Sequence, residues 1–150
     1  MAREILQSPV LRIAVTEKER QQVLSMLTAQ KLPVTDIGED TLLYQLLDGE
    51  KLIGTAGLDI FEDCALLRSV SVMAGVQGKG YGRLLNDQAE KFAKESGINC
   101  IYLVTTTAKD FFERQGYCVI KREDAPAAIK DTEQFSGLCP SSAIVMKKRL

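Results

Sequence analysis

The stretch Gln77-Gly78-Lys79-Gly80-Tyr81-Gly82 decides the fold, because it joins an apolar run ending at Val72 to the clearest helical pattern of the chain. Apolar side chains recur every three or four residues over 79–96, which predicts an amphipathic helix that Gly97 ends. Backbone N–H groups at a helix start are unpaired donors at the positive end of the helix dipole, and glycine lets a phosphate approach them closely. The stretch therefore predicts a loop that holds a pyrophosphate.

Two familiar phosphate-binding motifs do not fit this loop. A Walker loop fails because Gly75 lies too close to Gly78-Lys79 and because Gly80, not Ser or Thr, follows the lysine. A Rossmann loop would need a third glycine at Arg83, and the strands before the loop are expected to be antiparallel. On this segment alone, a glycine-rich turn that only begins a helix remains the alternative.

The chain before the loop is typical of an antiparallel meander. Apolar runs over 42–47 and 51–61 are separated by Asp48-Gly49, which is the strongest short signal for a hairpin, and a third run covers 65–72. Upstream, 11–15 is predicted to be a strand. A capping box of Thr16 and Glu19 then predicts the start of a helix.

Strands and helices also alternate after the loop. The expected elements are strands over 100–104, 117–121 and 143–147, and a short helix that Thr107 and Asp110 cap, that contains Phe111 and Phe112, and that Gly116 ends. Together with the meander they predict an α/β (α+β) fold with a mixed, mostly antiparallel sheet and helices on both faces. The crossover through the 79–96 helix should be parallel and right-handed.

The composition excludes several classes of function. The 150 residues contain no His, so a Ser-His-Asp hydrolase is excluded and a catalytic metal is not expected. With 19 Lys and Arg against 20 Asp and Glu, the chain has no overall positive charge for nucleic acid. No apolar run approaches the roughly 18 residues that a membrane span needs.

Length and cysteine usage predict one cytoplasmic domain over 1–150. That length fits a single domain of ordinary size. The four cysteines are widely spaced and form no Cys-x-x-Cys pair, so we expect them to be reduced, mostly packed thiols.

The order of these motifs resembles the GCN5-related N-acetyltransferase (GNAT) superfamily. The resemblance rests on a strand, Gln-x-x-Gly-x-Gly, an amphipathic helix, a strand, and then the segments 105–108 and 111–117, and it covers about residue 42 onward. Residues 103–108 with 112–114 are similar to the acetyltransferase domain of N-acetylglutamate synthases. The tail 135–143 resembles small acetyltransferases associated with arsenic-resistance operons.

The resemblance implies a site for acetyl-CoA as co-substrate. In that superfamily a strand splays from its parallel neighbour, and its free main-chain groups bind the pantetheine arm. The helix-start loop binds the pyrophosphate, and the segment after the next strand flanks the pantetheine and the sulfur. The implied cofactor-binding residues are Val70, Val72, Gln77, Gly78, Lys79, Gly80, Tyr81, Gly82, Arg83, Thr105, Ala108, Phe111 and Phe112.

The chain departs from the family at the general acid. Phe112 stands where relatives often have a Tyr, and Thr105 where they often have an Asn. Phe cannot donate a proton, so either a thiol with a pKa of roughly 8.5 leaves unaided, or Tyr117, Ser142 or Cys139 assists. The alternatives are a core aromatic for Tyr117, a loop hydroxyl for Ser142 and a buried thiol for Cys139.

Arg68 is a second departure, because many relatives have an acidic residue at this position. A cation on a sheet strand must be paired or exposed, since burying it alone costs several kcal/mol. One interpretation is a salt bridge. The other is substrate binding, in which the planar guanidinium holds an anionic group of the acceptor. Candidate bases that the sequence does not rank, and that would otherwise be solvated surface charges, are Glu62, Asp63 and Glu113.

These features predict an acetyl-CoA-dependent N-acetyltransferase for a small amino-acid-like amine, with a link to arsenic resistance left open. The alternatives are an amino-acid acetyltransferase like N-acetylglutamate synthase, a non-catalytic acyl-CoA sensor, and a protein-modifying acetyltransferase. No metal, nucleic acid or membrane partner is expected, and a homodimer is compatible with the sequence.

Overall fold

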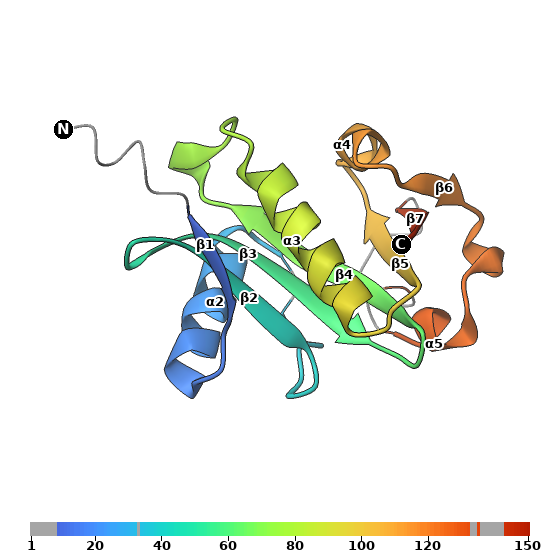
Figure 1. Cartoon of the computed structure of the whole chain (residues 1–150), viewed down its shortest axis with the longest axis horizontal. Helices are drawn as coiled ribbons and strands as arrows, with labels where there is room; N and C mark the ends of the chain where they lie inside the picture. Colours follow the sequence, from blue (N-terminus) through green and yellow to red (C-terminus); the bar gives the residue numbers. More distant parts are fainter. Residues whose placement is uncertain (1–8, 33, 133–134, 136–142) are drawn as a thin grey trace.

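A sheet of seven strands forms the centre of the molecule, in the order β1-β2-β3-β4-β5-β7-β6 (Figure 1). The computed structural model describes residues 9–32, 34–132, 135 and 143–150. The strands are β1 (Val10–Ile13), β2 (Leu42–Asp48), β3 (Lys51–Ile60), β4 (Cys64–Val72), β5 (Cys100–Thr105), β6 (Cys118–Ile120) and β7 (Ile144–Arg149). Only β4 and β5 pair in parallel, and the other neighbours are antiparallel. The expected mixed sheet with one parallel crossover is confirmed.

Helices cover both faces of this sheet. The helices are α2 (Glu17–Ala29), α3 (Tyr81–Glu95), α4 (Lys109–Arg114) and α5 (Ala127–Lys130), with short 3₁₀ turns η1 (Ala74–Val76) and η2 (Arg122–Asp124). None of the helices in the described part of the chain is both long and apolar enough to cross a bilayer.

The helix α3 lies across one face and fixes the largest part of the core. Leu85 and Ala89 of α3 are fully buried and share a cluster with Leu67 of β4. Burying one leucine side chain contributes roughly 1.5–3 kcal/mol, so these contacts hold the helix firmly on β3 and β4. The helix that follows the predicted loop is therefore anchored on the sheet.

The helix α2 covers the opposite face at the other end of the sheet. Leu43 packs with Val23 and Leu27 of α2, whereas its neighbour Tyr44 belongs to the α3 cluster, because successive side chains of a strand point to opposite faces. The predicted capping box is present: Thr16 Oγ1 accepts the Glu19 N–H at 3.1 Å, and Glu19 Oε1 accepts the Thr16 N–H at 3.0 Å.

The structure corrects one local expectation and adds one short helix that was not predicted. The helix α4 is not capped by Thr107 and Asp110, because Ala108 occupies its N-cap and no side chain caps it. Instead, Thr105 Oγ1 accepts the Ala108 N–H at 3.0 Å and closes the turn two residues earlier than expected. The short helix α5 was missed, since four residues are too few to show a helical period.

Candidate functional site

The parallel pair β4–β5 opens shortly after it begins. Its register runs only from Cys64 and Cys100 to Leu66 and Tyr102, although β5 continues to pair with β7 as far as Thr105. The edge of β4 from residue 68 to 72 therefore faces β5 without ladder hydrogen bonds. This is the splayed parallel pair expected from the resemblance.

A bulge in β4 accompanies the opening. Ser69 has a φ of 58°, and the β3–β4 register shifts between Thr55 and Gly57. The Thr55 hydroxyl donates to the Ser69 carbonyl at 2.8 Å and holds the bulged residue in place. A bulge bends a strand and increases its twist, which gives a physical reason for β4 to turn away from β5 here.

The glycine loop lies at the end of the opened strand. Gly78 and Gly80 have φ values of 86° and 85°, a region that L side chains adopt at a cost, and a Cβ at either position would meet no atom within 4 Å. Gly80 is the N-cap of α3, and no side chain caps the helix start. Lys79 and Arg83 are exposed on either side of it. The loop thus leaves space, free N–H donors and two cations at one helix start.

The predicted pantetheine residues adjoin this loop. Val70 and Val72 are half-buried and pack against the α3 cluster. The Gln77 side chain donates from Nε2 to the Val72 carbonyl at 3.0 Å, which ties the start of the loop to the end of β4. The structure therefore brings these three residues together.

The aromatic pair of α4 lies against the start of α3. Phe112 is 7% exposed and sits edge-to-face between Phe111 and Tyr117, at ring-centroid distances of 5.0 and 5.5 Å. A Cβ on Gly82 would lie 3.3 Å from the Phe111 ring, so the absence of a side chain there lets α4 approach α3. Phe112 lies in the core, and its neighbour Phe111 is the more exposed of the two.

Tyr117 belongs to a buried polar network. Its hydroxyl donates to Asn86 Oδ1 at 3.2 Å, and Asn86 Nδ2 donates to Glu90 Oε2 at 2.7 Å. Lys148 pairs with Glu90 at 2.8 Å. Burial, reinforced by the charge of Glu90, raises the pKa of Tyr117 above its ordinary value, so the phenol holds its proton. This environment favours the core-aromatic alternative for Tyr117.

Two tyrosines give a matched test of this network. Tyr117→Phe should lower the free energy of unfolding by about 1–3 kcal/mol, because it leaves the buried Asn86 oxygen without its donor. Tyr44→Phe should cost nothing or stabilise, because the buried Tyr44 hydroxyl has no partner among the described residues. Urea denaturation at pH 7 compares the two variants. Equal losses in the free energy of unfolding would contradict the hydrogen bond of the Tyr117 hydroxyl to Asn86 as a stabilising contact.

The same tyrosines predict an alkaline limit to stability. Burial raises the pKa of both phenols in the folded state, whereas in the unfolded chain they ionise near pH 10. The unfolded state therefore loses protons first, and stability should fall as the pH rises above about 10. Each variant should make that fall shallower.

Arg68 is fully enclosed in an ion pair on the face opposite α3. It is 4% exposed, and its guanidinium donates to both carboxylate oxygens of Asp36, in one case at 2.6 Å. Asp59 Oδ2 lies 3.4 Å from the same group, and the Thr41 hydroxyl donates to Asp59 Oδ1 at 2.6 Å. Burial alone would lower the pKa of Arg68, but the hydrogen bonds and charge of Asp36 raise it.

This geometry shows the salt bridge that the sequence left as one of two interpretations of Arg68. Asp36 accepts hydrogen bonds from both terminal nitrogens of the guanidinium group. This contact does not test whether Arg68 also binds an anionic group of the acceptor, which stays a prediction. The signal for a partner was present in the sequence, because a buried cation needs a carboxylate. The sequence did not indicate where that carboxylate lies, since Asp36 is 32 residues away in a segment without regular structure.

The partners of Arg68 line a cavity of about 520 Å³ between the segment 35–40 and the end of β3. Asp36, Asp40 and Asp59 contribute to its wall together with Phe61. Its volume falls in the range that small-molecule sites occupy.

A buried polar row in the sheet was not predicted from the sequence. Three buried polar residues lie opposite one another on β2, β3 and β4, namely Gln45, Thr55 and Ser71. The sequence signal for this row was the presence of polar residues in the middle of three otherwise apolar strands. The row leads from α2, where Gln22 accepts from Gln45 at 3.4 Å, to the bulged part of β4.

The remaining candidates are dispersed. Glu113 pairs with Lys109 at 3.3 Å on the surface of α4, and Glu62 and Asp63 are exposed in the turn before β4. The structure gives none of these carboxylates a place beside the bulge. Ser142 and Cys139 lie outside the described residues. No group of three or more His, Cys, Asp or Glu residues within the described ranges is arranged to hold a metal ion.

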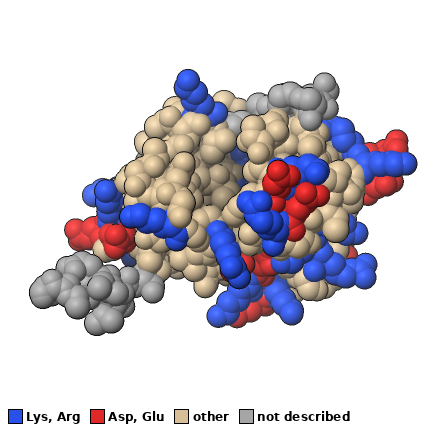
Figure 2. Space-filling view, turned by 90° about the horizontal axis from the view of Figure 1, so that it is seen from above, with Lys and Arg blue, Asp and Glu red and all other residues tan. Residues whose placement is uncertain are grey.

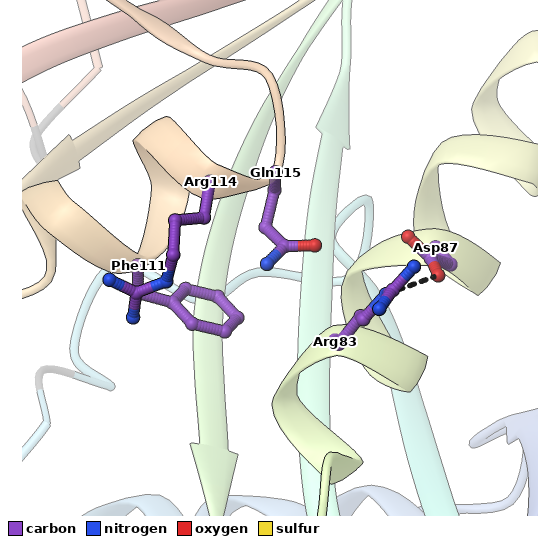
Figure 3. A pocket seen from close by; sticks show the side chains of 5 residues that line it. All are labelled: Arg83, Asp87, Phe111, Arg114 and Gln115. Carbon is purple, nitrogen blue, oxygen red and sulfur yellow. Dashed lines mark ion pairs between the residues drawn. The ribbon is translucent and has the colours of Figure 1, made fainter.

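A second cavity, of about 510 Å³, lies between α3 and α4. It is lined by Arg83 and Asp87 of α3 and by Phe111, Arg114 and Gln115 of α4 (Figure 3). Viewed from above the orientation of Figure 1, the surface has a hollow near its centre, and Lys and Arg side chains lie beside it (Figure 2). Arg114 was not among the residues predicted from the sequence.

The fold and the site define an α/β protein whose opened parallel strands end at a glycine loop and a helix start. Residues 11–117 match the model of the acetyltransferase (GNAT) family, which is most of the chain, and the protein belongs to that family. A curated relative, an uncharacterized N-acetyltransferase of Chlorobaculum tepidum, is 38% identical over 65 residues, which are 43% of this chain and 41% of the relative.

Solved structures support the same fold. N-acetylglutamate synthase from Neisseria gonorrhoeae, solved with coenzyme A and N-acetyl-glutamate, superposes with a TM-score of 0.78 at 20% identity over 96% of this chain and 35% of that one. A GNAT-family acetyltransferase from Staphylococcus aureus gives a TM-score of 0.72 at 19% identity, over 94% and 99% of the two chains. The chain thus spans about two fifths of its curated relative and about a third of the synthase.

Proposed function

We propose that this protein transfers an acetyl group from acetyl-CoA to the amine of a small amino-acid-like substrate. The observation that supports this most is the opening of β4 from β5 after Leu66, directly before the uncapped start of α3. An extended thioester cofactor fits this arrangement, because β4 offers free main-chain groups and the loop offers donors and positive charge. The coenzyme A in the synthase structure supports the same ligand.

The proposed reaction uses main-chain groups and proximity. A neutral amine attacks the thioester carbonyl, a C–N bond forms, the nitrogen loses its proton to solvent, and the C–S bond breaks to release the thiolate of CoA. An unpaired N–H of β4 between the bulge and Val72 donates to the oxyanion. Holding the two substrates side by side supplies effective molarities of order 10⁵ M. Phe112 takes no part in proton transfer.

We place the acceptor on the face opposite α3, at the cavity beside Asp36 and Asp59. Asp59 at this cavity pairs across the sheet with Leu66 of β4, the residue after which β4 opens from β5, so the cavity adjoins the opening on this face. An acceptor like that of N-acetylglutamate synthase, or an arsenic-containing amine, remains a narrower proposal within this class.

The three cysteines in the described part of the chain are free thiols, which supports a cytoplasmic location.

A screen for release of free CoA tests the proposed activity. Purified protein and acetyl-CoA are incubated with amino acids, organoarsenical amines and a lysine-containing peptide. At least one small amine should give turnover, with acetylation confirmed by mass spectrometry. Tight CoA binding without turnover on any amine would favour the sensor alternative, and turnover on the peptide alone would favour a protein-modifying enzyme.

A further inference from the structure

Two free cysteines lie side by side at the closed end of the opened strand pair. Cys64 begins β4, Cys100 begins β5, and these two residues are the first partners in the parallel register. Both belong to the cluster that contains Leu66, Tyr102 and Ile129 of α5. Because successive side chains of a strand alternate between faces, the two thiols lie on the same face of the sheet, opposite α3.

The spacing of these two residues suits a disulfide. Neighbouring strands lie about 4.7–4.9 Å apart, and disulfides join residues whose Cα atoms are about 4.4–6.8 Å apart. The backbone beside the pair is held by hydrogen bonds. The Asn99 N–H donates to the Asp63 carbonyl at 2.8 Å, and the Leu150 N–H donates to the Asn99 carbonyl at 2.8 Å. A bond between the two sulfurs therefore needs no rearrangement of either strand.

The two thiols differ in their access to solvent. Cys64 is 7% exposed, and burial, reinforced by the charge of Asp63, raises the pKa of its thiol. Cys100 is partly exposed and lies directly opposite Arg149 of β7, an exposed cation on the same face. A small anionic reagent therefore meets Cys100 first, and Cys64 is placed to react second.

From these observations we propose that Cys64 and Cys100 form a reversible disulfide by exchange with a small anionic disulfide such as oxidised glutathione. The Cys100 thiolate attacks one sulfur of that molecule, which forms a mixed disulfide and releases one glutathione thiolate. The Cys64 sulfur then attacks the Cys100 sulfur, and the second glutathione thiolate leaves. The two released thiolates take up the two protons that the cysteines lose. Two protein thiols are thereby oxidised, and one small disulfide is reduced to two thiols.

The bridge joins the ends of the segment that builds the cofactor side of the molecule. Residues 64–100 contain β4, the glycine loop and α3, which runs back along the sheet to the start of β5 (Figure 1). The bridge restricts the unfolded chain, and it leaves free the opening between β4 and β5, which begins after Leu66. The oxidised protein should therefore melt at a temperature about 5 °C higher or more.

Peptide mapping tests this site on the unmodified chain, because trypsin places each cysteine in a separate peptide. Cys64 falls in 52–68, Cys100 in 95–109, Cys118 in 115–121 and Cys139 in 131–147. The protein is incubated with oxidised glutathione, the remaining thiols are blocked with iodoacetamide, and the digest is analysed by mass spectrometry with and without a reductant. The peptides 52–68 and 95–109 should be linked, and the reductant should separate them.

Two serine variants connect the bridge to stability. Cys100→Ser should lose both the link and the rise in Tm that oxidised glutathione produces in the unmodified chain. Cys118→Ser removes an exposed thiol of β6 and is the matched control, so it should keep both.

Three results would overturn the inference. The first is a glutathione adduct on 95–109 that never links to 52–68, since it shows that Cys64 does not react. The second is a link from either peptide to 115–121 or 131–147 in place of the expected one. The third is the expected link without a rise in Tm, which contradicts the effect on unfolding. The mapping needs no variant, so it stands even if a serine variant folds poorly.

Discussion

Gly80→Asp should weaken coenzyme A binding about a hundredfold. The substitution places a carboxylate at the N-cap of α3, where the loop is proposed to hold the pyrophosphate. Repulsion between such charges a few ångströms apart is worth about 3 kcal/mol near a protein surface, which corresponds to two decades in Kd. The side chain itself meets open space, since a Cβ at this position has no atom within 4 Å. Calorimetry with coenzyme A measures the effect.

The backbone contribution to this effect can be separated with a matched variant. Gly97 has a φ of 87°, nearly the same as Gly80, and also faces open space, but it lies at the other end of α3. Gly97→Asp should therefore lose at least as much stability, because a negative charge at a helix C-terminus adds to the strain. Its affinity for coenzyme A should remain normal. Similar weakening in both variants would show that strain, rather than phosphate binding, explains the result.

Local patterns predicted the early hairpin of the sheet and the two long helices that cover its faces. The hairpin at Asp48-Gly49, the capping box of Thr16 and the long amphipathic helix all appear within one or two residues of their expected bounds. Each depends on a signal that lies within a few residues of sequence: turn glycines, a cap, or a helical period. The residues predicted to bind the cofactor in the loop and in the 105–112 segment lie near each other, because both segments adjoin α3.

Contacts between residues far apart in the sequence could not be predicted from local patterns. The contact of Arg68 with Asp36 joins a strand to a distant irregular segment, and no periodicity predicts where such a segment returns. The opening between β4 and β5 was expected from the family resemblance and not from the residues themselves. Ser69 adopts a left-handed conformation although it is not a glycine, so the sequence gives no local signal for the bulge. Arg114 likewise lies on the exposed side of a helix too short to show a period.

Arg68→Met should destabilise the protein by about 3–5 kcal/mol. Removing the cation leaves the side chain of Asp36, which is 7% exposed, as an unpaired buried charge, and the remaining partner Asp59 loses its counter-ion as well. Arg68→Lys keeps the charge but loses the planar fork, so it should cost less. Urea denaturation measures both. A loss below about 1 kcal/mol for Arg68→Met would contradict the enclosed ion pair.

The double variant Arg68→Met/Asp36→Asn distinguishes a structural arginine from one that also binds the acceptor. Neutralising both partners removes most of the cost of an unpaired buried charge, so the double variant should be clearly more stable than Arg68→Met alone. If Arg68 only holds Asp36, the acceptor KM should recover with stability. If Arg68 also binds an anionic group of the acceptor, KM should stay more than tenfold raised in the stable double variant. Coenzyme A affinity should be unchanged in either case, because Arg68 lies on the face opposite α3.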